Sequence, residues 1–183
     1  KRHADLIMKN SEAELVAICD IKAPGILGLN NYKAAYFSSL SELLNSGLEI
    51  DVITIATPNA LHASQALQCL SHNKHVVVEK PLSLKKSDAE EVVFKALQVH
   101  KHVFAVMQNR YSPPSVWLKE MVSSGKLGKI FLVQINCFWN RDERYYIKDS
   151  WHGSKELDGG TLFTQFSHFI DLMYWVFGDI ENI

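Results

Sequence analysis

The sequence of 183 residues has no apolar run long enough to cross a membrane and no excess of either charge. A membrane-spanning helix needs about 20 consecutive apolar residues, so we expect no membrane partner. The formal net charge of −1 offers no overall basic surface for nucleic acid. The first ten residues, KRHADLIMKN, also lack the apolar core of a signal peptide.

Cysteine is scarce, with Cys19, Cys69 and Cys137 spread widely along the chain. Three separated cysteines fit neither a disulfide framework nor the spacing of a zinc site. Free thiols of this kind suit a reducing compartment. We therefore expect buried thiols, no metal site and a cytoplasmic protein.

A glycine-rich loop is missing where one would be expected. A dinucleotide-binding unit opens with a strand and a G-x-G-x-x-G turn, about 20 residues before the acid that holds the ribose. Asp20 follows an apolar run and is a candidate for that acid, yet no glycine precedes it. We expect residues 2–9 to form the helix after such a turn, and the first strand and glycine loop to lie outside this sequence.

Four short apolar runs predict strands, at residues 13–20, 51–57, 75–80 and 102–109. They do not alternate between polar and apolar residues, which is typical of strands covered on both faces. Helical patterns separate most of them. This order predicts an α/β fold of the Rossmann type, with a doubly wound parallel sheet.

Capping residues mark three expected helix starts. Ser39 with Glu42 and Ser87 with Glu90 have the spacing of capping boxes. The pair Thr57–Pro58 resembles an N-cap followed by the first helical residue. We expect a helix to begin at each of these places.

The sequence pattern changes near residues 108–112. Beyond that point we expect a helix started by prolines, a strand at 129–139, a polar aromatic loop at 140–157 and one long helix at 158–177. The partly alternating pattern of this strand favours an open sheet, and the family resemblance described below implies that the sheet is mostly antiparallel. We therefore predict two domains: a Rossmann domain at 1–109, and at 110–183 the beginning of an α+β substrate domain that is truncated here.

The third apolar run ends in Glu79 and Lys80, and Pro81 follows. Ligands bind beyond the carboxyl ends of parallel strands, where a lysine side chain reaches a reacting group. Partial burial would lower the pKa of that lysine and suit it to proton transfer. The alternative is a charge pair at the strand end, exposed to solvent.

The predicted helix at 158–177 is apolar on nearly every side but carries one polar stripe. The histidine in this stripe makes it a candidate wall of a site, although the stripe is equally typical of a solvent-facing side. Two glycines, Gly159 and Gly160, precede it and would allow another backbone or a ligand to approach closely. The members of the stripe are Thr161, Thr164, Gln165, His168 and Asp171.

The segment ATPNALHASQALQCLSHNKHVVVEKPLSL resembles the signature of the Gfo/Idh/MocA oxidoreductases. Lys80 corresponds to the lysine of the family's E-K-P motif. The family's pattern of two glycines, an aspartate and a histidine four residues later corresponds to Gly159, Gly160, Thr164 and His168. Because Thr164 replaces the aspartate, we do not expect a strict Lys-Asp-His triad.

The resemblance implies an NAD-dependent dehydrogenase in which Lys80 and His168 are the catalytic residues, with either one as the base. Asp20 is expected to hold the adenosine ribose and so to favour NAD over NADP. The other residues expected at the cofactor are Thr57, Pro58, Asn59, His62, Glu79, Lys80 and Asn109.

The segments QINCFWNRDERYY and LDGGTLFTQFSHFIDLMYW are similar to one branch of the family. That branch oxidises C3 of UDP-N-acetylglucosaminuronate (UDP-GlcNAcA) in surface-polysaccharide synthesis. The resemblance therefore implies a small nucleotide-sugar substrate. Arg141 and Arg144 would hold a carboxylate or phosphate in a two-point grip. The other residues expected at the substrate are Tyr145, Tyr146, Trp151, Thr164, Gln165 and His168.

Three alternatives remain open. In the first alternative, Arg141 and Arg144 make surface ion pairs or subunit contacts and do not bind the substrate. The substrate would be another sugar or polyol, as in dehydrogenases of the inositol or glucose-fructose type. A non-catalytic nucleotide sensor on the same fold is the third, although a sensor has no need for Lys80 and His168 together. We expect a homodimer or homotetramer.

Overall fold

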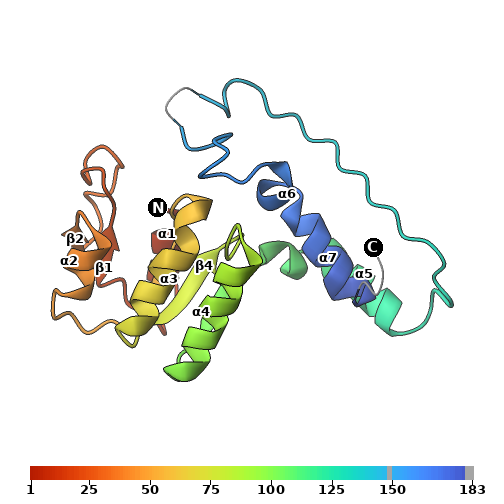
Figure 1. The fold of residues 1–183 in the computed structure, drawn as a ribbon, viewed down its shortest axis with the longest axis horizontal. Helices are drawn as coiled ribbons and strands as arrows, with labels where there is room; N and C mark the ends of the chain where they lie inside the picture. Colours follow the sequence, from red (N-terminus) through yellow and green to blue (C-terminus); the bar gives the residue numbers. More distant parts are fainter. Residues whose placement is uncertain (148–149, 180–183) are drawn as a thin grey trace.

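The structure is a computed structural model that describes residues 1–147 and 150–179. Five short strands occur in the first part of the chain (Figure 1): β1 Ala17–Cys19, β2 Ala35–Phe37, β3 Val52–Ile55, β4 His75–Glu79 and β5 Val103–Val106. The α-helices are α1 Arg2–Met8, α2 Leu40–Leu44, α3 His62–Ser71, α4 Lys86–Gln98, α5 Pro113–Ser123, α6 Thr161–Thr164 and α7 Ser167–Phe177. Two 3₁₀ turns, η1 Asn59–Leu61 and η2 Gln108–Tyr111, follow β3 and β5.

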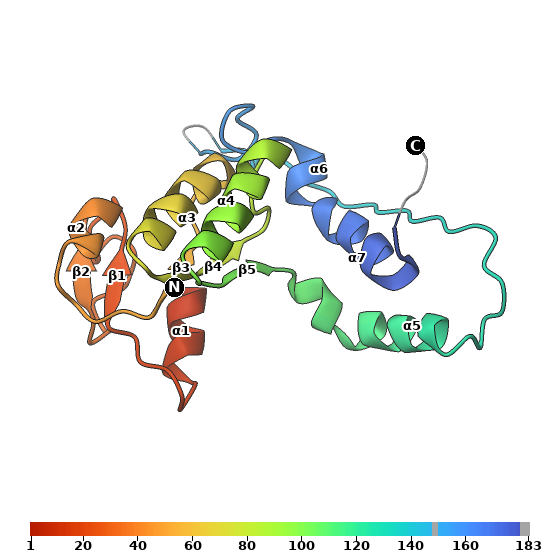
Figure 2. The ribbon, with the colours of Figure 1, turned by 60° about the horizontal axis from the view of Figure 1, so that its bottom comes forward.

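Every strand pairing is parallel, as the sequence predicted. Strand β4 lies between β3 and β5. Helices α3 and α4 cover one face of these strands, and α1 lies on the opposite side (Figure 2). The most deeply buried side chains join β4 to these helices: Val76, Val78, Cys69, Leu70 and Val92. The valine run therefore forms the centre of the core.

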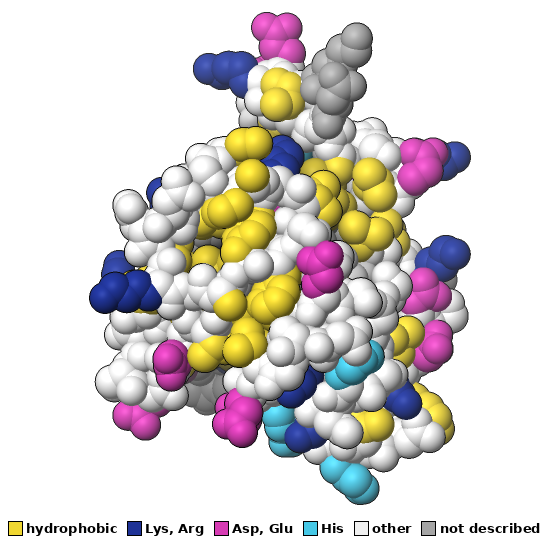
Figure 3. Space-filling model, turned by 90° about the vertical axis from the view of Figure 1, so that its left-hand side faces the viewer, with side chains coloured by type: hydrophobic (Ala, Val, Ile, Leu, Met, Phe, Trp, Pro, Cys, Tyr) yellow, Lys and Arg dark blue, Asp and Glu magenta, His cyan; other side chains and the backbone are white. Residues whose placement is uncertain are grey.

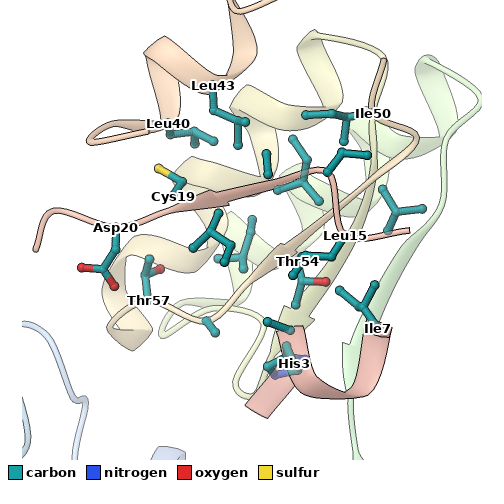
Figure 4. A pocket seen from close by; sticks show the side chains of 18 of the residues that line it. His3, Ile7, Leu15, Cys19, Asp20, Leu40, Leu43, Ile50, Thr54 and Thr57 are labelled. Atoms are coloured by element: carbon teal, nitrogen blue, oxygen red, sulfur yellow. The ribbon is translucent and has the colours of Figure 1, made fainter. Parts of the chain in front are cut away.

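The single sheet that we predicted is divided in two. Strands β1 and β2 form one sheet, and β3, β4 and β5 form the other. An apolar cavity of about 290 Å³ separates β1 from β3, lined also by α1 and α2 (Figure 4). It lies where a dinucleotide-binding sheet carries its first strand.

Hydrophobic side chains gather on the face of the molecule that carries β1, β2 and α2 (Figure 3).

One strand and two helix starts differ from the prediction. The three-residue strand β2 was missed, because so short a segment has no visible periodicity. Helix α4 begins at Lys86, so Ser87 lies inside the first turn, where its hydroxyl donates to Asp88. The capping box predicted at Ser87 is therefore wrong. At the third expected start, Pro58 precedes η1, and α3 begins only at His62.

The capping box at the start of α2 is confirmed. The Ser39 hydroxyl accepts a hydrogen bond from the Glu42 amide at 3.2 Å. In return, the Glu42 carboxylate accepts hydrogen bonds from the amide and hydroxyl of Ser38. These bonds, led by the one from the hydroxyl, lower the pKa of Glu42.

The expected strand at 129–139 is not formed. This segment is extended but has no strand beside it among the described residues, and a strand needs a neighbour to complete its hydrogen bonds. Its side chains Phe131, Leu132 and Phe138 are 84%, 82% and 96% exposed. The predicted antiparallel sheet is thus absent from the described part of the chain.

The expected long helix at 158–177 is shorter and interrupted. Gly159 and Gly160 have φ values of +80° and +89°, which a right-handed helix does not accommodate, so α6 begins at Thr161. At the end of α6, the Phe166 amide donates to Thr161 O at 2.9 Å, five residues back. This wider turn separates α6 from α7.

Of the cysteines, only Cys69 is fully buried, and burial raises the pKa of its thiol to about 12. Cys137 is partly buried and Cys19 is exposed, so the prediction of a buried thiol is wrong for Cys19. No helix in the described ranges has the length and apolar character needed to span a bilayer.

Candidate active site

Lys80 links the carboxyl end of β4 to the helices near the end of the chain. Its Nζ donates a hydrogen bond to the backbone carbonyl of Thr164 in α6. The side chain is partly buried. Burial lowers the pKa of Lys80 and the positive charge of Arg141 adds to this, while Glu79 and Asp158 oppose it. The alternative of a solvent-exposed charge pair is therefore contradicted.

His168 lies on α7 and is only 8% exposed. Its Nε2 is 3.5 Å from Nε2 of Gln108, which comes from the turn after β5. Its Nδ1 is buried and has no hydrogen-bond partner among the described residues. Burial, followed by the charge of Lys80, lowers the pKa of His168. The imidazole is therefore neutral near pH 7 and able to accept a proton.

Most of the polar stripe of α6 and α7 faces the protein, so the idea that it faces solvent is wrong except at Thr161, which is exposed. Thr164, Gln165 and His168 are buried. The apolar side chains Leu162 and Tyr174 are instead 62% and 52% exposed. Polar side chains turned inward beside a buried lysine are typical of a ligand site rather than of a packed core.

An ion pair holds α7 in place. Arg110 of η2 binds Asp171 through two nitrogens, with 2.8 Å between its Nε and one carboxylate oxygen. The Asp171 side chain is 12% exposed. From α5, Lys119 donates to the carbonyl of Trp175 at 2.6 Å. These contacts fix α7 one and two turns beyond His168.

Gly159 is required where the chain enters α6. A Cβ at this position would lie 2.4 Å from a methyl carbon of Leu84, which follows β4. The close approach that the paired glycines suggested is present at Gly159, where it is made by the side chain of Leu84, and it is absent at Gly160. It brings the segment before His168 against the segment after Lys80.

The predicted cofactor residues Asp20 and Thr57 lie at the same end of the cavity between β1 and β3 (Figure 4). One Asp20 oxygen accepts a hydrogen bond from the Lys22 amide at 2.9 Å, which fixes the carboxylate just beyond β1. A carboxylate so placed fits the ribose hydroxyls of a dinucleotide. The Thr57 hydroxyl donates to Gln65, and Pro58 follows it at the start of η1.

Three other predicted cofactor residues make contacts inside the protein through their side chains, and their place at the cofactor remains a prediction. Asn59 is 4% exposed and donates to the carbonyl of Asp158 at 2.8 Å. The ring nitrogens of His62 lie 2.7 Å from Pro81 O and 2.8 Å from Thr57 O. The Glu79 carboxylate pairs with His3 of α1 at 2.8 Å. These contacts join the turns that follow β3 and β4.

Asn109 is partly buried in η2, next to Arg110. This turn leads from β5 to α5, at the boundary that the sequence predicted between two domains. Asn109 therefore lies close in sequence to Gln108, the neighbour of His168.

The loop at 140–157 brings Arg141 to the site but not Arg144. The Arg141 guanidinium lies 4.4 Å from the ring centres of both Trp139 and Tyr145. Its Nε is buried without a partner among the described residues. Arg144 is 86% exposed and pairs with Asp142. The expectation that Arg141 and Arg144 together bind an anion is therefore wrong for Arg144. Arg144 makes a surface ion pair, as the alternative interpretation expected.

The aromatic residues of this loop pack on one another. Tyr145 meets Tyr146 edge-on at 5.0 Å between ring centres, and it meets His152 at 4.5 Å. Trp151 stacks on His152 at 4.0 Å. The cluster holds Arg141 on one side, while Tyr146 keeps 43% of its surface exposed.

Thr164 and Gln165, also expected at the substrate, are hydrogen-bonded to each other through their side chains.

Asp158 was missed by the sequence analysis. It is 3% exposed, and one of its carboxylate oxygens is buried without a partner among the described residues. A single acid in a polar loop gives no signal that distinguishes it from its neighbours.

Family descriptions match both parts of the chain. "Oxidoreductase family, NAD-binding Rossmann fold" matches residues 1–107, and "GFO/IDH/MocA C-terminal domain" matches residues 116–183. The chain belongs to the Gfo/Idh/MocA oxidoreductase family. Its first domain is therefore an NAD-binding Rossmann domain, and the fold predicted from the strand pattern is confirmed.

Two solved structures of WlbA dehydrogenases, both in complex with NADH and UDP-GlcNAcA, resemble this Gfo/Idh/MocA chain. The protein from Bordetella pertussis is 35% identical, with a TM-score of 0.89 over 98% of this chain and 56% of that one. The protein from Chromobacterium violaceum is 33% identical, with a TM-score of 0.91 over 98% of this chain and 52% of that one.

Among curated proteins, inositol 2-dehydrogenase of Salmonella typhimurium is 27% identical over 92% of this chain and 48% of its own length. The chain therefore spans about half the length of the relatives that it matches. What these relatives bind is a property of those proteins, and for this family member the substrate is a matter of proposal.

The place of Asp20 predicts its effect on cofactor choice. Replacing Asp20 with alanine in the full-length protein should weaken NADH binding by about tenfold, the effect of losing one charge-assisted hydrogen bond. NADPH binding should strengthen instead, because the variant no longer has the carboxylate that repels the 2′-phosphate. Fluorescence titration with both nucleotides measures this, and an equal loss for both would contradict the assignment.

Proposed function

We propose that this protein is an NAD-dependent dehydrogenase that oxidises C3 of a UDP-linked N-acetylhexosaminuronate, and that it serves surface-polysaccharide synthesis. The observation that carries the substrate class is Arg141. Its guanidinium lies 4.4 Å from the centres of two aromatic rings, and its buried Nε has no hydrogen-bond partner among the described residues. A guanidinium held in this way suits a carboxylate or phosphate. The likeness to two enzymes solved with UDP-GlcNAcA supports this choice.

The roles of His168 and Lys80 in proton transfer follow from their protonation states. Neutral His168 removes the proton from the C3 hydroxyl. The ammonium of Lys80 stabilises the negative charge that develops on that oxygen. Lys80 also keeps His168 neutral through its own charge. The exchanged assignment, with Lys80 as base, requires Lys80 to be neutral, and the pH test below distinguishes the two.

The residues present fit an NAD molecule in the cleft between the strands and the helix that carries His168. Asp20 would hold the ribose, and the turns after β3 and β4 would form the wall that leads to Lys80. When bound, the nicotinamide accepts the hydride that leaves the sugar carbon. The contacts of Asn59 and His62 with the backbone keep this wall in a fixed shape.

A substrate panel with the full-length protein tests the proposal. We expect NADH formation, or exchange with a 2-oxo acid that reoxidises bound cofactor, with UDP-GlcNAcA in preference to UDP-N-acetylglucosamine, glucose and inositol. Activity with inositol alone would favour the second candidate, which rests on the resemblance to inositol 2-dehydrogenase. NADH binding without oxidation of any sugar would favour the nucleotide sensor.

The role of Arg141 gives a sharper prediction. Arg141→Ala should raise KM for UDP-GlcNAcA by about tenfold or more and change KM for UDP-N-acetylglucosamine much less, because only the former carries the carboxylate. Arg144→Ala is the matched control, since Arg144 lies in the same loop but pairs with Asp142 at the surface. Steady-state kinetics with both sugars decide the point. An equal rise for both would mean that Arg141 does not recognise the sugar carboxylate.

The lowered pKa values of His168 and Lys80 predict that the pH range of activity is shifted toward acid. Burial lowers the pKa of His168, so the base becomes active at a pH below its usual value of about 6.5. Burial also lowers the pKa of Lys80, so the ammonium is lost at a pH below about 10.4. A bell-shaped profile of kcat/KM should show both limits. Activity that rises where Lys80 loses its proton would instead identify Lys80 as the base.

A further inference from the structure

Asp158 is held by contacts with the turn after β3 and with the loop before α6. Asn59, in the turn after β3, donates to its backbone carbonyl at 2.8 Å. One carboxylate oxygen accepts a hydrogen bond from the Gly153 amide. The next residue, Gly159, packs against Leu84 after β4. The position of the carboxylate is therefore set by the same turns that position Lys80.

The burial of the second carboxylate oxygen, Oδ1, is not explained by any contact within the described ranges. It is buried, and no hydrogen-bond donor lies within reach of it there. A buried acceptor without a donor destabilises the folded state, and a charged one does so strongly. Such groups persist where a ligand supplies the missing partner.

The other unpartnered atoms point to the same place. Three buried side-chain atoms lack partners among the described residues: Arg141 Nε, Asp158 Oδ1 and His168 Nδ1. Lys80 donates to the carbonyl of Thr164, one turn before His168. Asp158 is joined to the turn after β3 through Asn59, and Gly159 beside it lies against Leu84 after β4. The charges of Arg141 and Asp158 act on the pKa of Lys80, in agreement with this arrangement. Arg141 offers a donor and Asp158 an acceptor. A ligand between them needs an acceptor group and, separately, a hydrogen-bond donor.

We propose that Asp158 is a substrate-binding residue whose Oδ1 accepts a hydrogen bond from the C4 hydroxyl, the ring hydroxyl next to the oxidised carbon. This inference rests on the proposed function, because the donor is assigned on the sugar chosen there. Arg141 then binds the acidic group, and Asp158 recognises the ring. Asp158 restores a carboxylate to a site where Thr164 stands in place of the family's aspartate.

The test measures binding rather than turnover. We would titrate UDP-GlcNAcA and its 4-deoxy analogue into the full-length protein saturated with NADH, by calorimetry. In the unaltered protein the analogue should bind about tenfold more weakly, the effect of losing a hydrogen bond to a charged group. Asp158→Asn should weaken binding of UDP-GlcNAcA by a similar factor and leave binding of the analogue unchanged.

Asp142→Asn is the matched control, because Asp142 also lies between residue 139 and α6 and, among the described residues, forms its ion pair with Arg144 at the surface. It should bind both sugars like the unaltered protein. Melting temperature separates a binding role from a structural one. Asp158→Asn should melt no lower than the unaltered protein, since it removes a buried charge and keeps an oxygen for the Gly153 amide.

A lower melting temperature with unchanged sugar affinity would overturn the inference, as would an equal loss of affinity for both sugars. If the unaltered protein binds UDP-GlcNAcA but oxidises no sugar, the proposed reaction fails and the assignment of Asp158 is still decided by the two titrations. If it binds neither sugar, both proposals are overturned.

Discussion

Replacing Lys80 with methionine should lower kcat by about 10²–10⁴-fold, the usual loss when help with proton transfer is removed. Methionine keeps the length and apolar stem of the side chain, so the partly buried position should be filled. The bond from Nζ to the carbonyl of Thr164 is lost together with the charge. Binding of NADH should remain nearly unchanged, because the loss is confined to the chemical step.

Single-turnover kinetics and NADH titration measure the two quantities separately. Lys80→Arg is a suitable control, because it keeps the positive charge but changes its shape and hydrogen-bonding geometry. It should retain more activity than Lys80→Met. Near-normal turnover in Lys80→Met would rule out any role of this lysine in catalysis.

Replacing His168 with asparagine should cause a loss of kcat of similar size, about 10²–10⁴-fold. Asparagine is polar and fits the buried position, but it does not accept a proton near neutral pH. The acid limit of the pH profile should disappear, since the pKa assigned to His168 no longer contributes. An acid limit that persists in the variant would belong to another group and would contradict the assignment.

The double variant tests whether the two residues act as a unit. If His168 and Lys80 serve the same proton transfer, the combined loss should be much smaller than the product of the two single losses. Fully multiplicative losses would show that the residues act in separate steps.

The parts of the fold that the sequence predicted best are those decided by burial. The valine run of β4 is packed between neighbouring strands and helices, and this environment selects apolar residues without alternation. Lys80 was recognisable because a charged residue at the end of such a strand has no packing role. His168 was recognisable from its stripe, which turned out to be the buried side of α7.

The parts that could not be predicted depend on partners distant in the sequence. The segment at 129–139 has the composition of a strand, but strand formation needs a neighbour to complete its hydrogen bonds. The sequence pointed to a missing first strand but not to its effect on the sheet, which is a cavity between β1 and β3. Similarly, only the folded chain shows that Arg144 pairs with Asp142 while Arg141 reaches the site.

The same dependence on distant partners explains why the sequence missed one site residue and did not show the contacts of others. His62 lies in the family's signature segment, yet its two ring nitrogens bind backbone carbonyls of Thr57 and Pro81. Asp158 became a candidate only when its burial and its unpartnered oxygen were known. A signature in a sequence therefore locates a site, while contacts decide what each side chain does there.

The central claim is that hydride passes from C3 of a UDP-linked N-acetylhexosaminuronate to the nicotinamide, at the site formed by Lys80 and His168. The most direct measurement uses UDP-GlcNAcA deuterated at C3 and follows the label by mass spectrometry of the cofactor from the full-length protein. The account predicts deuterium in the reduced cofactor, and about 10²–10⁴-fold slower appearance of the label with Lys80→Met under the same conditions. Reduced cofactor without deuterium, or label lost to water, would contradict it.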